Sequence, residues 1–232
     1  MNGKTNKAIE KPKSKAGLWL ENYWYHYKWV TLLVAFLLIV GVICTVQAVQ
    51  NNSYDSYIMY AGPCQLSHKE VLDIEKDFYS VVEDKDGDGK VNIAIRELFI
   101  MSPEEISEVE EGYEANYTLI SDNLKLFDQE ILSGEATICL LSPFLFERVA
   151  EADGFLPIGE YVNGAEVEYF GEYGVKLSST VFGNMPGLSV LPDDTILCVR
   201  RVSTIASLFD KKQTEKNHAL NIETVKRIFE MD

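Results

Sequence analysis

The stretch WVTLLVAFLLIVGVICTV occupies residues 29–46 and contains no charged side chain. At about 1.5 Å per residue, an α-helix of this length spans roughly 27 Å, close to the thickness of a bilayer's hydrocarbon core. Residues 47–49 can extend it. The sequence therefore predicts a basic tail at 1–28, a transmembrane helix at 29–49 and a separate domain at 50–232.

The charges on the two sides of this apolar run predict its orientation. Six lysines against two glutamates precede it, a local balance of +4, and no Lys or Arg follows until Lys69. Because basic residues are retained on the cytoplasmic side, we expect residues 1–28 in the cytoplasm and the C-terminal domain outside the cell membrane. Aromatic residues crowd the segment 17–29, which is either a membrane-surface helix or the interfacial start of the spanning helix. We favour the second because aromatic side chains alone explain it.

A cleaved signal peptide is the competing interpretation of the apolar run, with Val46-Gln47-Ala48 as the cleavage motif. However, the run exceeds the roughly 7–15 residues of a signal's hydrophobic region, and the basic region before it is long. Ile43 precedes Cys44 at the position where a lipoprotein motif carries a small residue. We therefore expect an uncleaved, single-pass anchor.

Composition limits the classes of partner. Hydrophobic residues make up 47% of the chain and charged residues 25%, which is typical of a folded protein. The net charge of the chain is −15, so the part after the +4 tail carries −19. Such an acidic domain repels phosphate backbones, and we expect no nucleic-acid partner.

Strand and helix patterns alternate through the outer domain. Strands are expected at 54–61, 91–100, 136–141, 175–178 and 195–202, and helices at 66–83, 102–132 with a break near 117–122, 143–152 and 219–231. This order predicts an α/β fold with a mostly parallel sheet and helices on both faces.

Serines stand just before three of the expected helices, at Ser67, Ser102 and Ser142. Ser67 is followed by Glu70 in a capping-box spacing, and prolines follow the other two. Right-handed crossovers would bring these helix starts to the carboxyl edge of the sheet, where open α/β sheets bind ligands. The candidate ligand-binding residues are Gln65, Ser67, Ser102 and Ser142. Helix capping alone is a sufficient alternative reason for serine at these positions.

Two longer stretches carry a resemblance to a known family: NLKLFDQEILSGEATICLLSPFLFERVAEADGFLPI (123–158) and YGVKLSSTVFG (173–183). They resemble one lobe of bacterial extracellular solute-binding proteins of the type II periplasmic kind, and LPDDTILCVRR (191–201) and the final helix are compatible. The resemblance implies a non-enzymatic lobe that recognises a small polar solute. Such proteins usually trap ligand between two lobes, whereas about 180 residues suffice for one compact domain. A protein-interaction subunit that docks on a membrane complex through a reduced form of this fold is therefore the alternative.

The segment DKDGDGKVN (84–92) is similar to a calcium-binding loop, with carboxylates at the first, third and fifth positions followed by glycine. The candidate metal ligands are Asp84, Asp86, Asp88 and Asn92. Ile95 stands where such loops carry a bidentate Glu, so calcium binding there would be weak. The alternative is a solvated turn between a helix and a strand, for which Asp and Gly are the expected residues.

The outer domain shows no recognised catalytic motif, so we expect no enzymatic activity, and an uncharacterised hydrolase ranks third among the functions. His68 and His218 lack companions at metal-ligand spacing and are expected at the surface. Of the three outer cysteines, Cys139 and Cys198 lie in apolar strands, where free cysteine behaves as a small hydrophobe. This odd number allows one disulfide, but nothing in the sequence indicates one.

Overall fold

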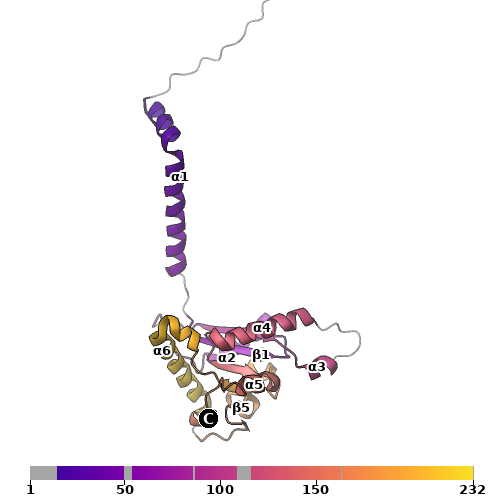
Figure 1. Cartoon of the computed structure of the whole chain (residues 1–232). Coiled ribbons are helices and arrows are strands. Elements are labelled where there is room, and N and C mark those ends of the chain that lie inside the picture. Colours follow the sequence, from indigo (N-terminus) through magenta and orange to yellow (C-terminus); the bar gives the residue numbers. More distant parts are fainter. Residues whose placement is uncertain (1–14, 50–53, 86, 109–115, 163, 232) are drawn as a thin grey trace, which may run out of the picture. The chain divides into compact units, whose positions relative to one another are not determined.

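The computed structural model describes residues 15–49, 54–85, 87–108, 116–162 and 164–231. The chain forms two compact units, Met1–Asn52 and Ser53–Asp232. The first contains helix α1 (Lys15–Val49) (Figure 1). Within α1, Glu21–Thr45 is long and apolar enough to cross a membrane.

Helix α1 begins well before the apolar run. The rings of Trp19 and Tyr23 stack with their centroids 5.7 Å apart, and those of Tyr23 and Tyr27 stack at 5.3 Å. Residues four apart lie on one side of a helix, so these contacts continue the helix through the aromatic segment. The segment 17–29 is thus continuous with the apolar helix, and the residue at which the membrane-spanning part begins stays a prediction.

The second unit is built on a six-stranded sheet. Its strands are β1 (Ser56–Gly62), β2 (Ile93–Phe99), β3 (Ile138–Leu141), β4 (Tyr169–Phe170), β5 (Gly174–Lys176) and β6 (Ile196–Val199). Their order is β2-β1-β3-β6-β5-β4. The expected α/β class is confirmed, and the pattern analysis missed the two-residue strand β4.

The expectation of a mostly parallel sheet was wrong, because the sheet is mixed. β1 pairs in parallel with β2 and β3, whereas the β3–β6, β6–β5 and β5–β4 pairs are antiparallel. Parallel neighbours require a crossover connection, and helices supply one after β1 and after β2. Short turns and 3-10 helices connect β4, β5 and β6 instead, which permits antiparallel pairing. The half of the sheet formed by β2, β1 and β3 is therefore parallel, as the sequence predicted, and the other half is antiparallel.

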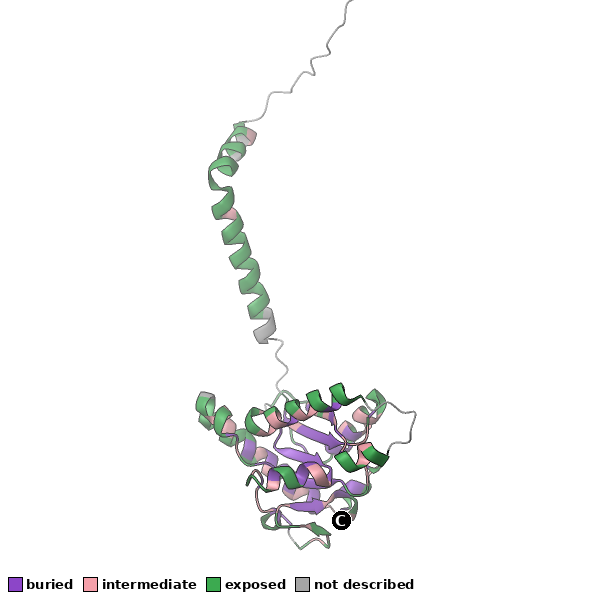
Figure 2. Ribbon diagram, turned by 45° about the vertical axis from the view of Figure 1, so that its right-hand side comes forward, coloured by how far each residue is buried: buried purple, intermediate pink, exposed green. Residues whose placement is uncertain are grey.

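Helices cover the sheet on both faces, as expected (Figure 2). They are α2 (His68–Phe78), α3 (Pro103–Glu108), α4 (Tyr117–Ser133), α5 (Pro143–Ala150) and α6 (Thr204–Phe229). Helix α6 begins 15 residues before the expected start at Ala219, since its first half is mostly polar and largely exposed, with its few apolar residues, such as Ile205 and Leu208, confined to its first turns. Asp210 interrupts this half with non-helical backbone angles (φ −148°, ψ 85°).

Two apolar clusters form the core, one on each face of the sheet. Along β3, Ile138 and Leu140 join the cluster that contains Phe78 of α2 and Val225 of α6. The intervening Cys139 and Leu141 join the other cluster, under α4 and α5. This alternation follows from the two-residue period of a strand. Burying each large apolar side chain contributes about 1.5–3 kcal/mol, so the two clusters are the main source of stability.

Candidate functional site

The carboxyl ends of β1, β2 and β3 meet at one edge of the sheet, as the sequence predicted. The N–H of Ile100 donates to the Gly62 carbonyl at 2.9 Å, and the N–H of Ser142 donates to the Ala61 carbonyl at 2.9 Å. These bonds extend the ladder beyond the strands and hold the starts of the three following helices beside one another. We call this the carboxyl edge.

Two of the three serine hydroxyls at the carboxyl edge are engaged in helix capping. The Oγ of Ser67 accepts the N–H of Glu70 at 3.4 Å, and the Glu70 carboxylate accepts the N–H of Ser67 at 2.6 Å. Ser102 and Glu105 form the same reciprocal pair, at 3.1 and 2.6 Å. The expected capping box at Ser67 is confirmed. These hydroxyls already satisfy helix N–H groups, which leaves less capacity for an added ligand.

The remaining candidates at the carboxyl edge differ from these two. The side chain of Ser142 makes no capping hydrogen bond, and Gln65 is exposed. Nearby, the Glu97 carboxylate accepts the N–H of Leu66 at 2.7 Å and adds negative charge to the edge. A ligand role for the four residues stays a prediction.

The aspartate-rich segment forms a tight turn. Asp84 accepts the N–H groups of Gly87 and Gly89 at 2.6 and 2.8 Å, and Asp88 accepts the N–H of Lys90 at 2.7 Å. Both glycines have positive φ, 77° and 84°, which favours glycine. Such side-chain-to-backbone bonds are those of an Asx turn, the alternative given above.

Calcium binding by this turn remains a prediction. Asp86 lies outside the described residues, and among the described ones no cluster of three acidic, His or Cys side chains suits a metal ion. The N–H of Asn92, the fourth candidate ligand, donates to Asp55 at 2.7 Å. That bond ties the end of the turn to the start of β1.

A buried polar cluster lies at the opposite edge of the sheet, where β1, β2 and β3 begin; we call this the amino edge. Asn221 of α6 is its centre: its Oδ1 accepts the Ser56 hydroxyl at 2.9 Å and the Lys85 ammonium at 2.7 Å. The Asn221 amide donates to the Thr137 hydroxyl at 3.4 Å. Asp55 accepts the N–H of Lys85 at 2.6 Å. The cluster joins β1, the aspartate turn, β3 and α6.

Lys85 is the cation of this cluster, and the pKa of its side chain is shifted. Burial lowers the pKa of its ammonium group to about 8, and the Asp55 carboxylate only partly opposes that effect. Burial thus disfavours the charged form of the ammonium group, and the Asn221 amide oxygen replaces part of its hydration.

Arg200 follows β6 at the same edge and is almost fully buried, with 4% of its surface exposed. Its guanidinium donates to the carbonyls of Ile131, Gly134 and Ala136 at 2.9, 2.6 and 2.7 Å. It therefore satisfies carbonyl groups at and just beyond the end of α4, where a helix has no further N–H groups to donate to them. His218, which we expected at the surface, is buried, with its Nε2 2.7 Å from the Arg200 carbonyl oxygen. That expectation was wrong because α6 extends across residue 218.

A hollow of about 730 Å³ opens beside Arg200, between the ends of α4 and α5, the end of β6 and the start of α6. We call it the amino-edge hollow. Leu132, Val149 and Ile205 contribute an apolar wall. Its charged lining residues are Asp128, Arg148, Glu151, Asp153, Arg200 and Arg201. The Arg148–Asp128 and Arg201–Asp153 ion pairs both measure 2.8 Å, and the two arginine side chains are nearly half exposed. The hollow thus presents both signs of charge beside an apolar surface.

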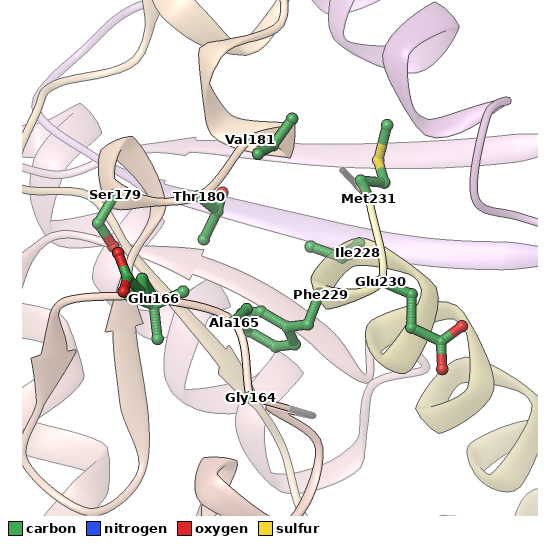
Figure 3. Close-up of a pocket in the computed structure, with 11 residues that line it drawn as sticks. Gly164, Ala165, Glu166, Ser179, Thr180, Val181, Ile228, Phe229, Glu230 and Met231 are labelled. Carbon is green, nitrogen blue, oxygen red and sulfur yellow. The ribbon is translucent and has the colours of Figure 1, made fainter.

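A second hollow, of about 440 Å³, lies at the end of α6 against the segments 164–167 and 179–181; we call it the C-terminal hollow (Figure 3). Its two hydroxyl groups are engaged: Ser179 donates to the Lys176 carbonyl at 2.7 Å, and Thr180 donates to the Leu177 carbonyl at 2.7 Å. Figure 3 shows the Glu230 carboxylate directed away from the other side chains. This hollow offers fewer polar groups for a ligand than the amino-edge hollow.

The amino-edge hollow was not predicted from the sequence. Its lining comes from residues 128–154 and 200–205, which only the antiparallel pairing of β3 with β6 brings together. One signal was present, since Arg200-Arg201 is an adjacent basic pair in a strongly acidic domain.

Comparisons with known proteins return no relatives. No protein-family model matches the chain, and no curated protein or solved structure matches it. The resemblance to one lobe of a solute-binding protein therefore stays a prediction from the sequence pattern.

Proposed function

We propose that this chain is a single-pass membrane protein whose outer domain binds a small polar molecule at the amino-edge hollow without catalysing a reaction on it. Helix α1 serves as the anchor, with the N-terminus in the cytoplasm and the domain outside. The length and apolar character of Glu21–Thr45 support the anchor, and the excess of lysine before it supports the orientation.

The observation that carries the binding role is the chemistry of the amino-edge hollow. Its volume of about 730 Å³ falls within the roughly 300–1,000 Å³ of small-molecule sites, which are mostly apolar with a few fixed polar groups. Part of the guanidinium group of Arg148 and of Arg201 remains exposed to solvent and can donate hydrogen bonds to a ligand. The ion pairs with Asp128 and Asp153 hold the two arginine side chains in place. Paired charges of both signs favour a zwitterion, so we propose an amino acid or a short peptide as the ligand class.

The absence of catalysis is part of the same proposal. The described residues that line the hollow include neither His nor Cys. Ser203, its serine, donates to the Leu132 carbonyl at 2.9 Å and accepts the N–H of Ala206 at 3.1 Å as a helix cap. A hydroxyl held in this way has no adjacent base to activate it as a nucleophile.

Thermal unfolding of the full-length protein in detergent micelles tests the binding role. We expect at least one compound from a panel of amino acids, di- and tripeptides and sugars to raise the melting temperature, because binding to the native state stabilises it. Ile205→Glu in the apolar wall should remove the shift. The matched control is Val181→Glu in the C-terminal hollow, also at an exposed apolar position, which should retain it. If no compound shifts the wild-type melting temperature, small-molecule binding is contradicted.

A docking role on a membrane complex is the second candidate, and one surface favours it. Leu208 is 80% exposed on the first half of α6, and Ile205, one turn earlier, is also exposed and lines the amino-edge hollow together with the exposed Leu132. Apolar side chains gathered in this way mark protein contact surfaces. Chemical cross-linking of the full-length protein in its native membrane should then capture a partner, and Leu208→Asp should abolish the capture. Capture that survives this change would exclude the surface.

A further inference from the structure

The first half of α6 is fixed to the amino edge at both of its ends. At one end, the Ser203 hydroxyl donates to the Leu132 carbonyl at 2.9 Å. At the other, the Nε2 of His218 lies 2.7 Å from the Arg200 carbonyl oxygen. Residues 204–217, between these two contacts, are mostly exposed. We call this segment the α6 arm.

The α6 arm combines apolar side chains with lysines. Ile205 and Leu208, one turn apart, are 44% and 80% exposed. Three exposed lysines follow within six residues: Lys211, Lys212 and Lys216. Against them stand Asp210 and Glu215, so three positive and two negative charges give the arm a net charge of +1. The arm is therefore a weakly basic, partly apolar surface on a domain whose net charge is −19.

The covalent connection to α1 keeps the amino edge close to the end of that helix. Four residues, 50–53, join Val49 of α1 to Tyr54. Consecutive Cα atoms are about 3.8 Å apart, so the Cα atoms of Val49 and Tyr54 are separated by at most about 19 Å. Tyr54 leads into β1 at the amino edge, and the Ser56 hydroxyl there bonds to Asn221 of α6 at 2.9 Å. The edge that carries the arm is thus the edge at which the chain arrives from α1.

We propose that the α6 arm lies on the outer surface of the bilayer that α1 crosses. Ile205 and Leu208 enter the boundary between headgroups and acyl chains, and the three lysines contact anionic phospholipid headgroups. This inference rests on the proposed anchoring by α1 and goes beyond ligand binding. Apolar side chains beside lysines on an exposed helix are typical of segments that bind anionic membrane surfaces. Tyr54, 45% exposed, adds an aromatic ring of the kind that favours this depth.

Charge and reach favour the bilayer over a protein partner for this surface. The rest of the domain is strongly acidic, and the aspartate turn lies at the same edge, so anionic headgroups repel both and confine the contact to the arm. The short connection to α1 makes the contact intramolecular in effect, since the bilayer surface is always within reach. A weak individual affinity is then sufficient to hold the arm on the surface.

Hydrogen exchange of the full-length protein in lipid nanodiscs, with one copy per disc, tests the proposal. Discs of phosphatidylcholine alone are compared with discs of equal parts phosphatidylcholine and phosphatidylglycerol. Each lysine near an anionic surface adds about a fivefold preference, so amides of the arm should exchange about tenfold more slowly in the anionic discs. The first turn of α4 is the internal control: Tyr117 is 66% exposed there, and its amides should exchange equally in both discs.

Substitutions examine the apolar and the charged parts of the contact separately. Leu208→Glu and Lys212→Glu should each remove most of the slowing in anionic discs, whereas Lys212→Arg should keep it. Tyr117→Glu is the matched control at an exposed apolar position outside the arm, and it should keep the slowing as well. Equal exchange of the wild-type arm in the two kinds of disc overturns the proposal and leaves the surface to a protein partner. Slowing that neither glutamate variant reduces overturns it too.

Flotation of the same discs on a density gradient at high salt separates this inference from the anchor. High salt screens the lysine contacts but does not extract a membrane-spanning helix. Protein that floats with the discs and shows no lipid-dependent exchange keeps the proposed anchor and loses the surface contact. Protein that does not float with the discs contradicts the anchor, and the inference fails with it.

Discussion

The polar side chains at the two edges of the sheet form hydrogen bonds over different distances in the sequence. At the carboxyl edge, Ser67 and Ser102 bond to residues three positions away and cap their own helices. At the amino edge, Ser56 bonds to Asn221, 165 positions away, and Lys85 reaches the same residue across 136 positions. The first edge is an assembly of local structures, whereas the second ties distant segments of the chain together. We therefore expect substitutions at the amino edge to cost more stability.

The largest effect is expected from Arg200→Met at the amino edge. The substitution leaves one buried and two part-buried carbonyl groups without their donors, and an unsatisfied buried group costs about 1–3 kcal/mol. We expect a loss of about 3 kcal/mol or more in the free energy of unfolding. Urea unfolding of the full-length protein in micelles, followed by tyrosine near-ultraviolet circular dichroism, measures it. The control is Arg201→Met at an exposed ion pair, which should cost less than about 1 kcal/mol.

Asn221→Ala should produce the next largest effect. It removes the acceptor shared by Ser56 and Lys85 and leaves a buried hydroxyl and a half-buried ammonium unpaired. We expect about 2 kcal/mol of destabilisation in the same urea experiment. Asn217, four residues earlier on α6, is exposed and bonds only to Gln213 among the described contacts, so Asn217→Ala should change little. Equal losses of stability for the two variants would show that the amino-edge cluster does not stabilise the contact between these distant segments.

The pH dependence of stability should carry the signature of Lys85. Its pKa falls from 10.5 to about 8 on folding, so between about pH 8 and 10 the unfolded chain binds more protons than the native one. The contribution of Lys85 to stability then rises with pH across this window, by roughly 1 kcal/mol or more, whereas burial raises the pKa of the Cys198 thiol and gives that group a contribution of opposite sign. Lys85→Met should flatten the rise relative to wild type. Parallel profiles for the two proteins would show that the ammonium is not perturbed.

At the carboxyl edge, Ser67→Ala should cost about 1 kcal/mol, the usual value of a helix cap. Ser142 provides the matched comparison, because its side chain makes no capping bond. Ser142→Ala should therefore cost distinctly less. The comparison of the two edges would fail if either change cost as much as Arg200→Met.

The last effect expected is a gain in stability, that of calcium on the aspartate turn. A loop with an incomplete carboxylate set binds calcium at about 0.1–1 mM, so 5 mM calcium would add roughly 1–2 kcal/mol and raise the melting temperature. Magnesium at the same concentration should not reproduce the shift, and Asp88→Asn should reduce it. An unchanged melting temperature would leave the turn as a purely protein-bonded Asx turn.

The features predicted correctly are those that residues close together in the sequence determine. The capping box at Ser67 and the parallel pairing of β1 with β2 and β3 both follow from short-range patterns. The antiparallel half did not follow, since β4 and β5 have only two and three residues and no clear period. The amino-edge hollow and cluster depend on contacts between distant segments, such as Arg200 with Ala136 across 64 positions and Ser56 with Asn221 across 165, and a single sequence gives no direct signal for such contacts.

The position of β6 has a consequence for how the chain is made. It is the last strand to leave the ribosome, yet it lies between β3 and β5 at the middle of the sheet. Until residues 196–199 are available, each of its neighbours has an unpaired apolar edge, and such edges invite aggregation. Pairing at this sequence separation is also slow to nucleate. The unit Ser53–Asp232 therefore completes its sheet only once residues 196–199 have been made, and until then its half-built sheet is open to aggregation.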